Sequence, residues 1–152
     1  MVVQAFEYWG EVSGITFVRV DDNANMCGDI RVGLSTGDFG GAGGWANVPY
    51  YYQGENNSTA NDIWIRQQYD PIVYGSVYGP LILIHEIGHA IGLAHTHDNG
   101  YRSTAEENTN IYSVMSYIGW GNFNNDDWID FGYEAGDWFP AYQPMVNDIA
   151  AI

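Results

Sequence analysis

The sequence predicts a single domain of the α+β class, in which short strands precede a helix that is rich in histidine. Apolar and polar residues alternate in segments 15–20 and 62–66, which is the pattern of half-buried strands. Between Pro80 and Gly92 the apolar residues recur at helical spacing, and proline suits the first turn of a helix. A chain of 152 residues can form one hydrophobic core, so residues 1–152 are expected to be one domain.

Shorter elements complete this prediction. Helices are expected at residues 3–9 and 145–152, and further strands at residues 29–33 and 45–49. Pro49 favours an edge position for the last of these strands, because proline cannot donate a hydrogen bond to a neighbouring strand. The residues expected on the buried side of the long helix are Leu81, Ile84, Gly88 and Ile91.

The glycine-rich run at residues 37–44 is predicted to be a long turn. Its glycines could suggest a phosphate-binding loop, but neither the Gly-Lys-Ser/Thr sequence nor a helix follows them. Residues 50–60 are predicted to be a polar loop.

The long helix carries residues that suit a metal site. His85 and His89 are four apart, so both imidazoles project from one face of the helix toward a common ion. Glu86 lies on the adjacent strip, close to such an ion but free to act as a base. Gly92 is placed to end the helix in a left-handed turn that brings His95 back as a third ligand. Three histidines leave an open position on zinc, which is the arrangement of a catalytic site.

A second segment strengthens this interpretation. Residues 113–117 read Ser-Val-Met-Ser-Tyr, and a methionine turn after the three histidines is a signature of the metzincin proteases. The competing interpretation is an amphipathic core helix with incidental histidines. All 4 histidines of the chain lie between His85 and His97, and a site explains that clustering better than chance.

The charge of the chain limits its partners. Acidic residues number 19 against 4 basic ones, for a formal net charge of -15. Nucleic acid and anionic membranes are therefore not expected as partners, because the chain repels phosphates. Basic peptides or calcium fit the sign better, although an acidic surface that aids solubility explains it too. No apolar run is as long as a membrane span, and no signal peptide is expected at the N-terminus.

Three further features of the sequence could in principle be metal or redox sites. Cys27 is the only cysteine, so no intrachain disulfide forms, and we expect a packed thiol rather than a plug on the zinc. His97 is expected to point away from the ion, since it follows His95 by only two residues. Residues 122–130 are rich in Asn and Asp, which is compatible with calcium. They lack the glycine of an EF-hand loop, which favours a solvated acidic loop.

The chain resembles the catalytic domain of the serralysin-type metzincins, which are zinc endopeptidases secreted by bacteria. The resemblance rests on the histidine motif, on segments 113–117 and 144–152, and on segments 45–49 and 61–64, so that it covers nearly the whole chain. It implies a twisted mixed sheet with an active-site helix, a methionine turn and a C-terminal helix. It also implies secretion to the extracellular space and protein or peptide substrates, with a proteinaceous protease inhibitor as a further conceivable partner.

The resemblance also implies roles for individual residues. Zinc would be bound by His85, His89 and His95, with Tyr117 as an additional, displaceable ligand. Glu86 would be the general base, Met115 would lie beneath the metal, and Gly92 would make the turn. The residues matching the edge strand that pairs with substrate are Trp45, Ala46, Asn47 and Val48.

Two features depart from the serralysin pattern. Thr96 stands where serralysins usually have proline, and the glycine-rich calcium repeats of their C-terminal β-roll are absent. The expected reaction is hydrolysis of peptide bonds by water that zinc activates and Glu86 deprotonates. The alternatives are a zinc-binding pseudoenzyme or interaction module, and an enzyme of the matrix-metalloprotease type with additional structural metals.

Overall fold

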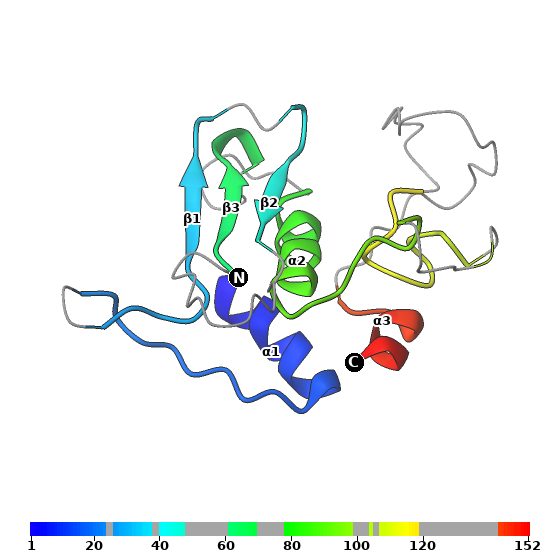
Figure 1. The fold of residues 1–152 in the computed structure, drawn as a ribbon, viewed down its shortest axis with the longest axis horizontal. Coiled ribbons are helices and arrows are strands. Elements are labelled where there is room, and N and C mark those ends of the chain that lie inside the picture. The colour runs from blue at the N-terminus through cyan, green and yellow to red at the C-terminus, as the bar shows by residue number, and fades with distance from the viewer. Residues whose placement is uncertain are drawn as a thin grey trace, which may run out of the picture.

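The computed structural model describes residues 1–23, 26–37, 40–47, 61–69, 78–98, 104, 107–118 and 143–152. These residues form a three-stranded sheet with helices packed around it (Figure 1). The elements in chain order are α1 (Val2–Ser13), β1 (Val32–Ser35), β2 (Gly44–Ala46), β3 (Ile63–Arg66), the 3-10 helix η1 (Gln67–Tyr69), α2 (Tyr78–Ala90) and α3 (Val146–Ala151). None of the helices in these ranges is long and apolar enough to cross a membrane.

The sheet is mixed, with the strand order β1-β3-β2. Strand β3 pairs in parallel with β1 and antiparallel with β2, so that Trp64 faces Gly33 on one side and Trp45 on the other. Strand β2 therefore lies at one edge of the described sheet, where Pro49 predicted an edge strand. The α+β class and the mixed sheet are confirmed.

The helix α2 lies along the sheet beside β2 and is buried on nearly every side (Figure 1). The apolar side chains of Ile63 and Ile65 on β3, together with Ala46 on β2, are each at most 5% exposed and form the sheet side of the core. Ile84 and Ile87 of α2 are at most 2% exposed in the same cluster. Burial on this scale gives α2 its stability, because a helix of 13 residues is marginal in isolation.

The helix α1 braces α2 from beneath. Trp9 is fully buried, and its indole Nε1 donates a hydrogen bond of 3.0 Å to the backbone oxygen of Ile84. A buried indole N–H requires such a partner. The bond attaches α1 to α2 at Ile84, the residue that precedes His85. The turn at Gly14, where φ is 70°, ends α1 four residues later than the predicted helix.

An ion pair joins the residues that precede strands β1 and β3. Arg31 donates from Nε to Oδ1 of Asp62 at 2.9 Å, and its Nη2 lies 2.5 Å from Oδ2. Asp62 is only 2% exposed, so the bidentate guanidinium satisfies a carboxylate that would otherwise be buried without a partner. This pair fixes the relative position of β1 and β3.

Three local predictions were wrong. Residues 15–20 form no strand, and Val18 is 73% exposed, because their alternating pattern has no neighbouring strand in the described chain to pair with. The strand predicted at 29–33 begins later, at Val32. Cys27 is exposed rather than packed, since it lies in an irregular segment that no helix or strand covers.

We expect Gly88→Ala to destabilise the protein, although alanine favours a helix over glycine by about 1 kcal/mol. A Cβ at position 88 would lie 2.6 Å from Sδ of Met115 and 3.1 Å from Cζ2 of Trp9. Overpacking of this kind typically costs about 1–3 kcal/mol, which exceeds the gain in propensity. The midpoint of urea unfolding of the metal-free protein measures the balance, and an unchanged or higher midpoint would contradict the packing described here.

Candidate active site

The last turns of α2 present two of the three predicted ligands. The rings of His85 and His89 lie edge to face, with centroids 4.7 Å apart, as the four-residue spacing requires. The helix ends at Ala90, and Gly92 follows with φ of 110°, a conformation that side chains rarely adopt. This turn returns the chain so that the ring of His95 lies 4.5 Å from that of His89. One nitrogen of each of the three histidines lies within 4.8 Å of the others.

The outward-facing nitrogens of these rings all have acceptors. Nδ1 of His85 lies 2.7 Å from the backbone oxygen of Val114, and Nδ1 of His89 lies 2.8 Å from that of Leu93. Nδ1 of His95 lies 3.3 Å from Oδ2 of Asp98. Because oxygens of these kinds can only accept, each Nδ1 carries the proton and each Nε2 keeps its lone pair. Such second partners fix the tautomer and orientation of metal-binding histidines.

The inward-facing nitrogens test whether a metal fits. Nε2 of His89 lies 3.0 Å from Nε2 of His95, and both lack a proton when Nδ1 is the donor. Two lone pairs at this distance repel each other, and a cation between them relieves the repulsion. The donor set of three imidazoles suits zinc, with a fourth position open. The residues present therefore fit a zinc ion.

The protonation of the histidines favours the same chemistry. Burial lowers the pKa of His85 to about 3 and that of His95 to about 4, and it lowers the pKa of His89 as well. The mutual repulsion of the three rings adds to the first two shifts. The neutral imidazole, which is the form that binds a metal, is thus the form present at neutral pH.

Glu86 is buried between α2 and the edge strand. Burial raises the pKa of its carboxyl to about 8, and a hydrogen bond from the backbone of Ala46 opposes that rise. The close approach of β2 depends on Gly44, where a Cβ would lie 2.9 Å from Cγ of Glu86. A carboxyl with a raised pKa, held beside three histidines, is suited to accepting and returning a proton.

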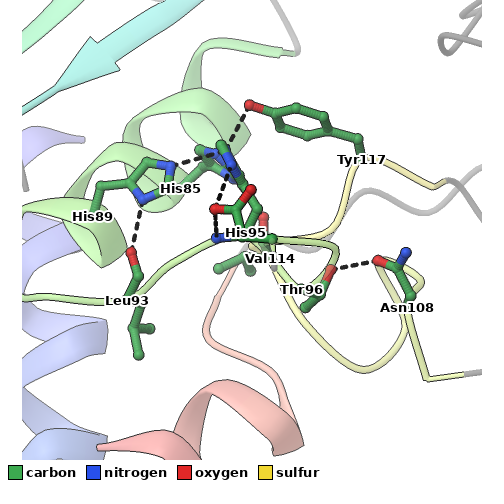
Figure 2. A network of polar contacts seen from close by, with 9 residues as sticks. His85, His89, Leu93, His95, Thr96, Asn108, Val114 and Tyr117 are labelled. Atoms are coloured by element: carbon green, nitrogen blue, oxygen red, sulfur yellow. Dashed lines mark hydrogen bonds and ion pairs between the residues drawn. The ribbon is translucent and has the colours of Figure 1, made fainter. Parts of the chain in front are cut away.

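Tyr117 reaches the histidines with its hydroxyl directed toward the ring of His95, as Figure 2 shows. Its hydroxyl lies 2.6 Å from Nε2 of His95, the nitrogen that faces the other two histidines. Its side chain remains 43% exposed, so substrate can reach the phenol. Partial burial, with the nearby charges of Glu86 and Asp98, raises the pKa of Tyr117 to about 12, so the phenol stays protonated.

Met115 lies beneath the histidines in the methionine turn. It is 2% exposed and contacts the backbone of α2 at Gly88, where only glycine leaves room. The turn is tied internally by a hydrogen bond of 3.0 Å from the backbone N–H of Met115 to Oγ of Ser113. The buried sulfur thus supports the segment of α2 between His85 and His89.

Asp148 is a residue that sequence reasoning did not identify. It lies in α3, is 2% exposed, and accepts hydrogen bonds from Oγ of Ser113 at 2.6 Å and from the backbone N–H of Val114 at 2.9 Å. A third, of 2.8 Å, comes from the backbone N–H of Met145. The carbonyl of Val114 in turn receives Nδ1 of His85, so α3 holds the acceptor of the first histidine. Burial raises the pKa of Asp148, and these three donors hold that increase back.

Asn108 is a second residue that the sequence did not reveal. Its Oδ1 accepts hydrogen bonds from Oγ1 of Thr96 and, at 2.9 Å, from Oγ of Ser116. Thr96 directly follows His95, and Ser116 directly precedes Tyr117, so one amide oxygen joins the segments that carry these two residues. Figure 2 shows the contact of Asn108 with Thr96. Thr96, which departs from the serralysin pattern, supplies here a hydroxyl that proline lacks. An Asn in an irregular segment carries no sequence signal of this role.

The residues predicted to bind substrate lie on the edge strand β2 and directly after it. Trp45 is 52% exposed and Ala46 is buried within β2, and Asn47 follows it directly. Val48 lies outside the described residues, as does the segment 122–130 considered for calcium. His97 stacks on His95 with ring centroids 5.0 Å apart and lies outside the cluster of three.

An active-site helix with two histidines, a third beyond a glycine turn and a methionine turn beneath them define a fold of the metzincin type. The family model Peptidase_M10, described as Matrixin, matches residues 1–113. The chain therefore belongs to the Matrixin peptidase family.

Individual relatives give the same result. Serralysin A of Dickeya chrysanthemi is 31% identical over 97% of this chain and 30% of its own length. Metalloprotease AprA of Pseudomonas entomophila is 31% identical over 97% of this chain and 31% of its own length. Matrix metalloproteinase-18 of Xenopus laevis is 28% identical over 65% of this chain and 21% of its own length. The predicted resemblance to serralysins is confirmed, and the chain spans under a third of their length.

We expect Asp148→Ala to loosen the methionine turn. The substitution leaves two buried donors and one half-buried donor without an acceptor, each buried one at a cost of about 1–3 kcal/mol, so the free energy of unfolding should fall by about 3 kcal/mol or more. Asp148→Asn, which keeps an acceptor oxygen, should lose much less. Chemical denaturation of the metal-free proteins measures both variants, and equal losses would argue against hydrogen bonding as the role of Asp148.

Proposed function

We propose that residues 1–152 form one catalytic domain of a zinc-dependent endopeptidase. The observation that carries this proposal is the convergence of three unprotonated Nε2 atoms, each oriented by an acceptor on Nδ1, beside the buried carboxyl of Glu86. Membership of a peptidase family supports the same conclusion.

The metal would be held by His85, His89 and His95. Zinc bound there supplies Lewis acidity, since it polarises the scissile carbonyl and lowers the pKa of a coordinated water to about 7. A site that only stabilises a fold usually closes all four positions with protein ligands, which supports catalysis over an interaction module.

Glu86 moves the proton. Its carboxylate takes a proton from the attacking water and then delivers it to the nitrogen of the leaving amine, so that the peptide bond breaks with no net gain or loss of protons. Burial makes the ionised form of this carboxyl a stronger base than an exposed carboxylate, and a cation held by the neighbouring histidines would favour that ionised form. The backbone hydrogen bond from Ala46 orients it toward the strand where substrate would lie.

Tyr117 stabilises the charge that develops on the substrate. Its protonated hydroxyl, 2.6 Å from Nε2 of His95, is close enough to the site to donate a hydrogen bond to an oxyanion there. The displaceable role expected for this residue requires that the phenol leave Nε2 when substrate binds.

The edge strand β2 would bind the peptide. Gly43 accepts from Arg66, and Asn47 donates to the backbone oxygen of Asp62, so both use backbone groups toward β3. Because hydrogen-bonding groups alternate along an antiparallel strand, those of Gly44 and Ala46 are directed away from β3. An extended substrate could add to this edge as an antiparallel strand along Trp45, Ala46, Asn47 and Val48. Because the N–H of Ala46 donates to Glu86, the carbonyl of Ala46 is the group of that residue left to accept from the substrate.

The proposals about partners and cellular location rest on the resemblance to serralysins. Protein or peptide substrates follow from the proposed reaction, and action outside the cell follows from the likeness to serralysins. The contact of Tyr117 with His95 favours the serralysin type over the matrix-metalloprotease type. One tightly bound zinc per chain is expected for the former and two for the latter, and calcium and a proteinaceous inhibitor are further predicted partners.

We expect zinc-loaded protein to hydrolyse casein, a chelator to abolish the cleavage, and Glu86→Gln to lower kcat/KM by about 10³-fold with zinc retained, because a general base contributes about 10²–10⁴-fold. Glu11→Gln, an exposed change of the same chemistry on α1, is the matched control and should keep full activity. Full activity of Glu86→Gln, or cleavage that resists chelation, would exclude this mechanism.

We expect Tyr117→Phe to lower kcat by about 100-fold with little change in KM, because one donor to an oxyanion is worth about 10²–10³-fold in rate. Tyr112→Phe removes an exposed hydroxyl from the same segment and should have no effect. Steady-state kinetics on a peptide substrate separate the two constants. A rise in KM with unchanged kcat would instead assign Tyr117 to substrate binding.

A further inference from the structure

His97 is an imidazole beside the active site that the proposed mechanism does not use. Its ring lies nearly parallel to that of His95, with an angle of 12° and centroids 5.0 Å apart, and it lies 5.1 Å from the ring of Tyr117. His97 is exposed, and neither of its ring nitrogens has a hydrogen bond in the part of the chain that the structure describes. An unpaired imidazole in this position is available to an external ligand.

Asp98 places a carboxylate next to this ring. Its Oδ2 receives the backbone N–H of His95 at 3.1 Å and lies 3.3 Å from Nδ1 of the same residue. The side chain is 47% exposed, and its other oxygen has no hydrogen bond among the described residues. One oxygen of Asp98 therefore orients His95, while the other is accessible.

The spacing of these groups suits a second cation. One potential ligand atom from each of His95, His97 and Asp98 lies within 4.8 Å of the other two. Nε2 of His95 faces the site of the three histidines, so it is already committed. A second ion would therefore have His97 and Asp98 as its protein ligands, with water completing its coordination.

We propose that His97 and Asp98 bind a second, exchangeable divalent ion, of the zinc class, beside the catalytic position. Imidazole with carboxylate suits zinc and its neighbours, whereas calcium prefers ligands that are all oxygen. The net charge of -15 raises the local concentration of cations around the chain. With two protein ligands this site is weaker than the one with three histidines, so it fills only when free zinc is in excess.

The second ion would inhibit the enzyme, a consequence that rests on the proposed function. An ion on the accessible oxygen of Asp98 would withdraw charge from the carboxylate that accepts from Nδ1 of His95, and weakening of such a partner weakens the hold of a histidine on its metal. Excess zinc should therefore reduce activity without unfolding the protein.

The test compares zinc binding by three proteins. Metal-free wild type, His97→Gln and Glu11→Gln are dialysed to equilibrium against buffers of rising free zinc, and bound zinc per chain is counted. We expect wild type and Glu11→Gln to bind one zinc tightly and a second weakly, and His97→Gln to keep the tight site while its second affinity falls by about tenfold or more. Glu11→Gln controls for the loss of exposed polar groups and for diffuse binding by the acidic surface.

Two results would overturn the proposal. A second zinc bound by His97→Gln with the affinity of wild type would assign it to other acidic groups. Wild type that never exceeds one zinc would show that His97 only stacks on His95.

Activity forms a separate arm of the experiment. Casein hydrolysis at one zinc per chain tests the proposed function, and its failure leaves the zinc count interpretable. If hydrolysis occurs, we expect excess zinc to inhibit wild type and Glu11→Gln, and His97→Gln to need about tenfold more zinc for the same inhibition. Equal inhibition of all three proteins would refute the inhibitory role of this site.

Discussion

The hydrogen bond from Nδ1 of His85 to the carbonyl of Val114 is the contact on which the site depends. It joins α2 to the methionine turn, and Asp148 fixes that turn from α3 through the neighbouring N–H of Val114. Three segments far apart in sequence are thereby connected through one residue, Val114. The orientation of the first histidine is set by the C-terminal helix, and the fold and the chemistry of the site are stabilised together.

The three histidines use three kinds of restraint. His85 relies on a distant carbonyl, His89 on the carbonyl of Leu93 four residues later, and His95 on the exposed carboxylate of Asp98. Only the last of these acceptors is charged and accessible to solvent. The hold on His95 is therefore the one that ions in solution can reach, whereas the other two are protected by burial.

The histidine cluster was predictable from the sequence because its geometry is local. A four-residue spacing on a helix and a glycine turn place His85, His89 and His95 together without knowledge of the rest of the fold. Asp148 and Asn108 could not be predicted, because their roles depend on contacts between segments that are distant in sequence. The exposure of Cys27 was missed for a related reason, since thiols are usually buried but burial requires a covering element.

The sequence predicted a strand correctly where the segment has a neighbouring strand to pair with, and incorrectly where it has none among the described residues. Alternation at residues 62–66 matches β3, which has a strand on each side, whereas the same pattern at residues 15–20 corresponds to no strand. An alternating sequence shows only that a segment is able to form a strand, and it forms one where a neighbouring strand is present to pair with it.

The hydroxyl of Ser116 affects the motion of the residue that follows it. Besides donating to Asn108, it accepts the backbone N–H of Ile118 at 3.1 Å, and the carbonyl of Ile118 accepts from Asn110. The backbone is thus held on both sides of Tyr117, and the phenol can leave His95 by rotation about its own side-chain bonds. Rotamer changes of exposed side chains take picoseconds to nanoseconds, whereas collective segment motions extend to milliseconds. We therefore expect the proposed displacement of the phenol to occur by a rotamer change of Tyr117 rather than by movement of the segment.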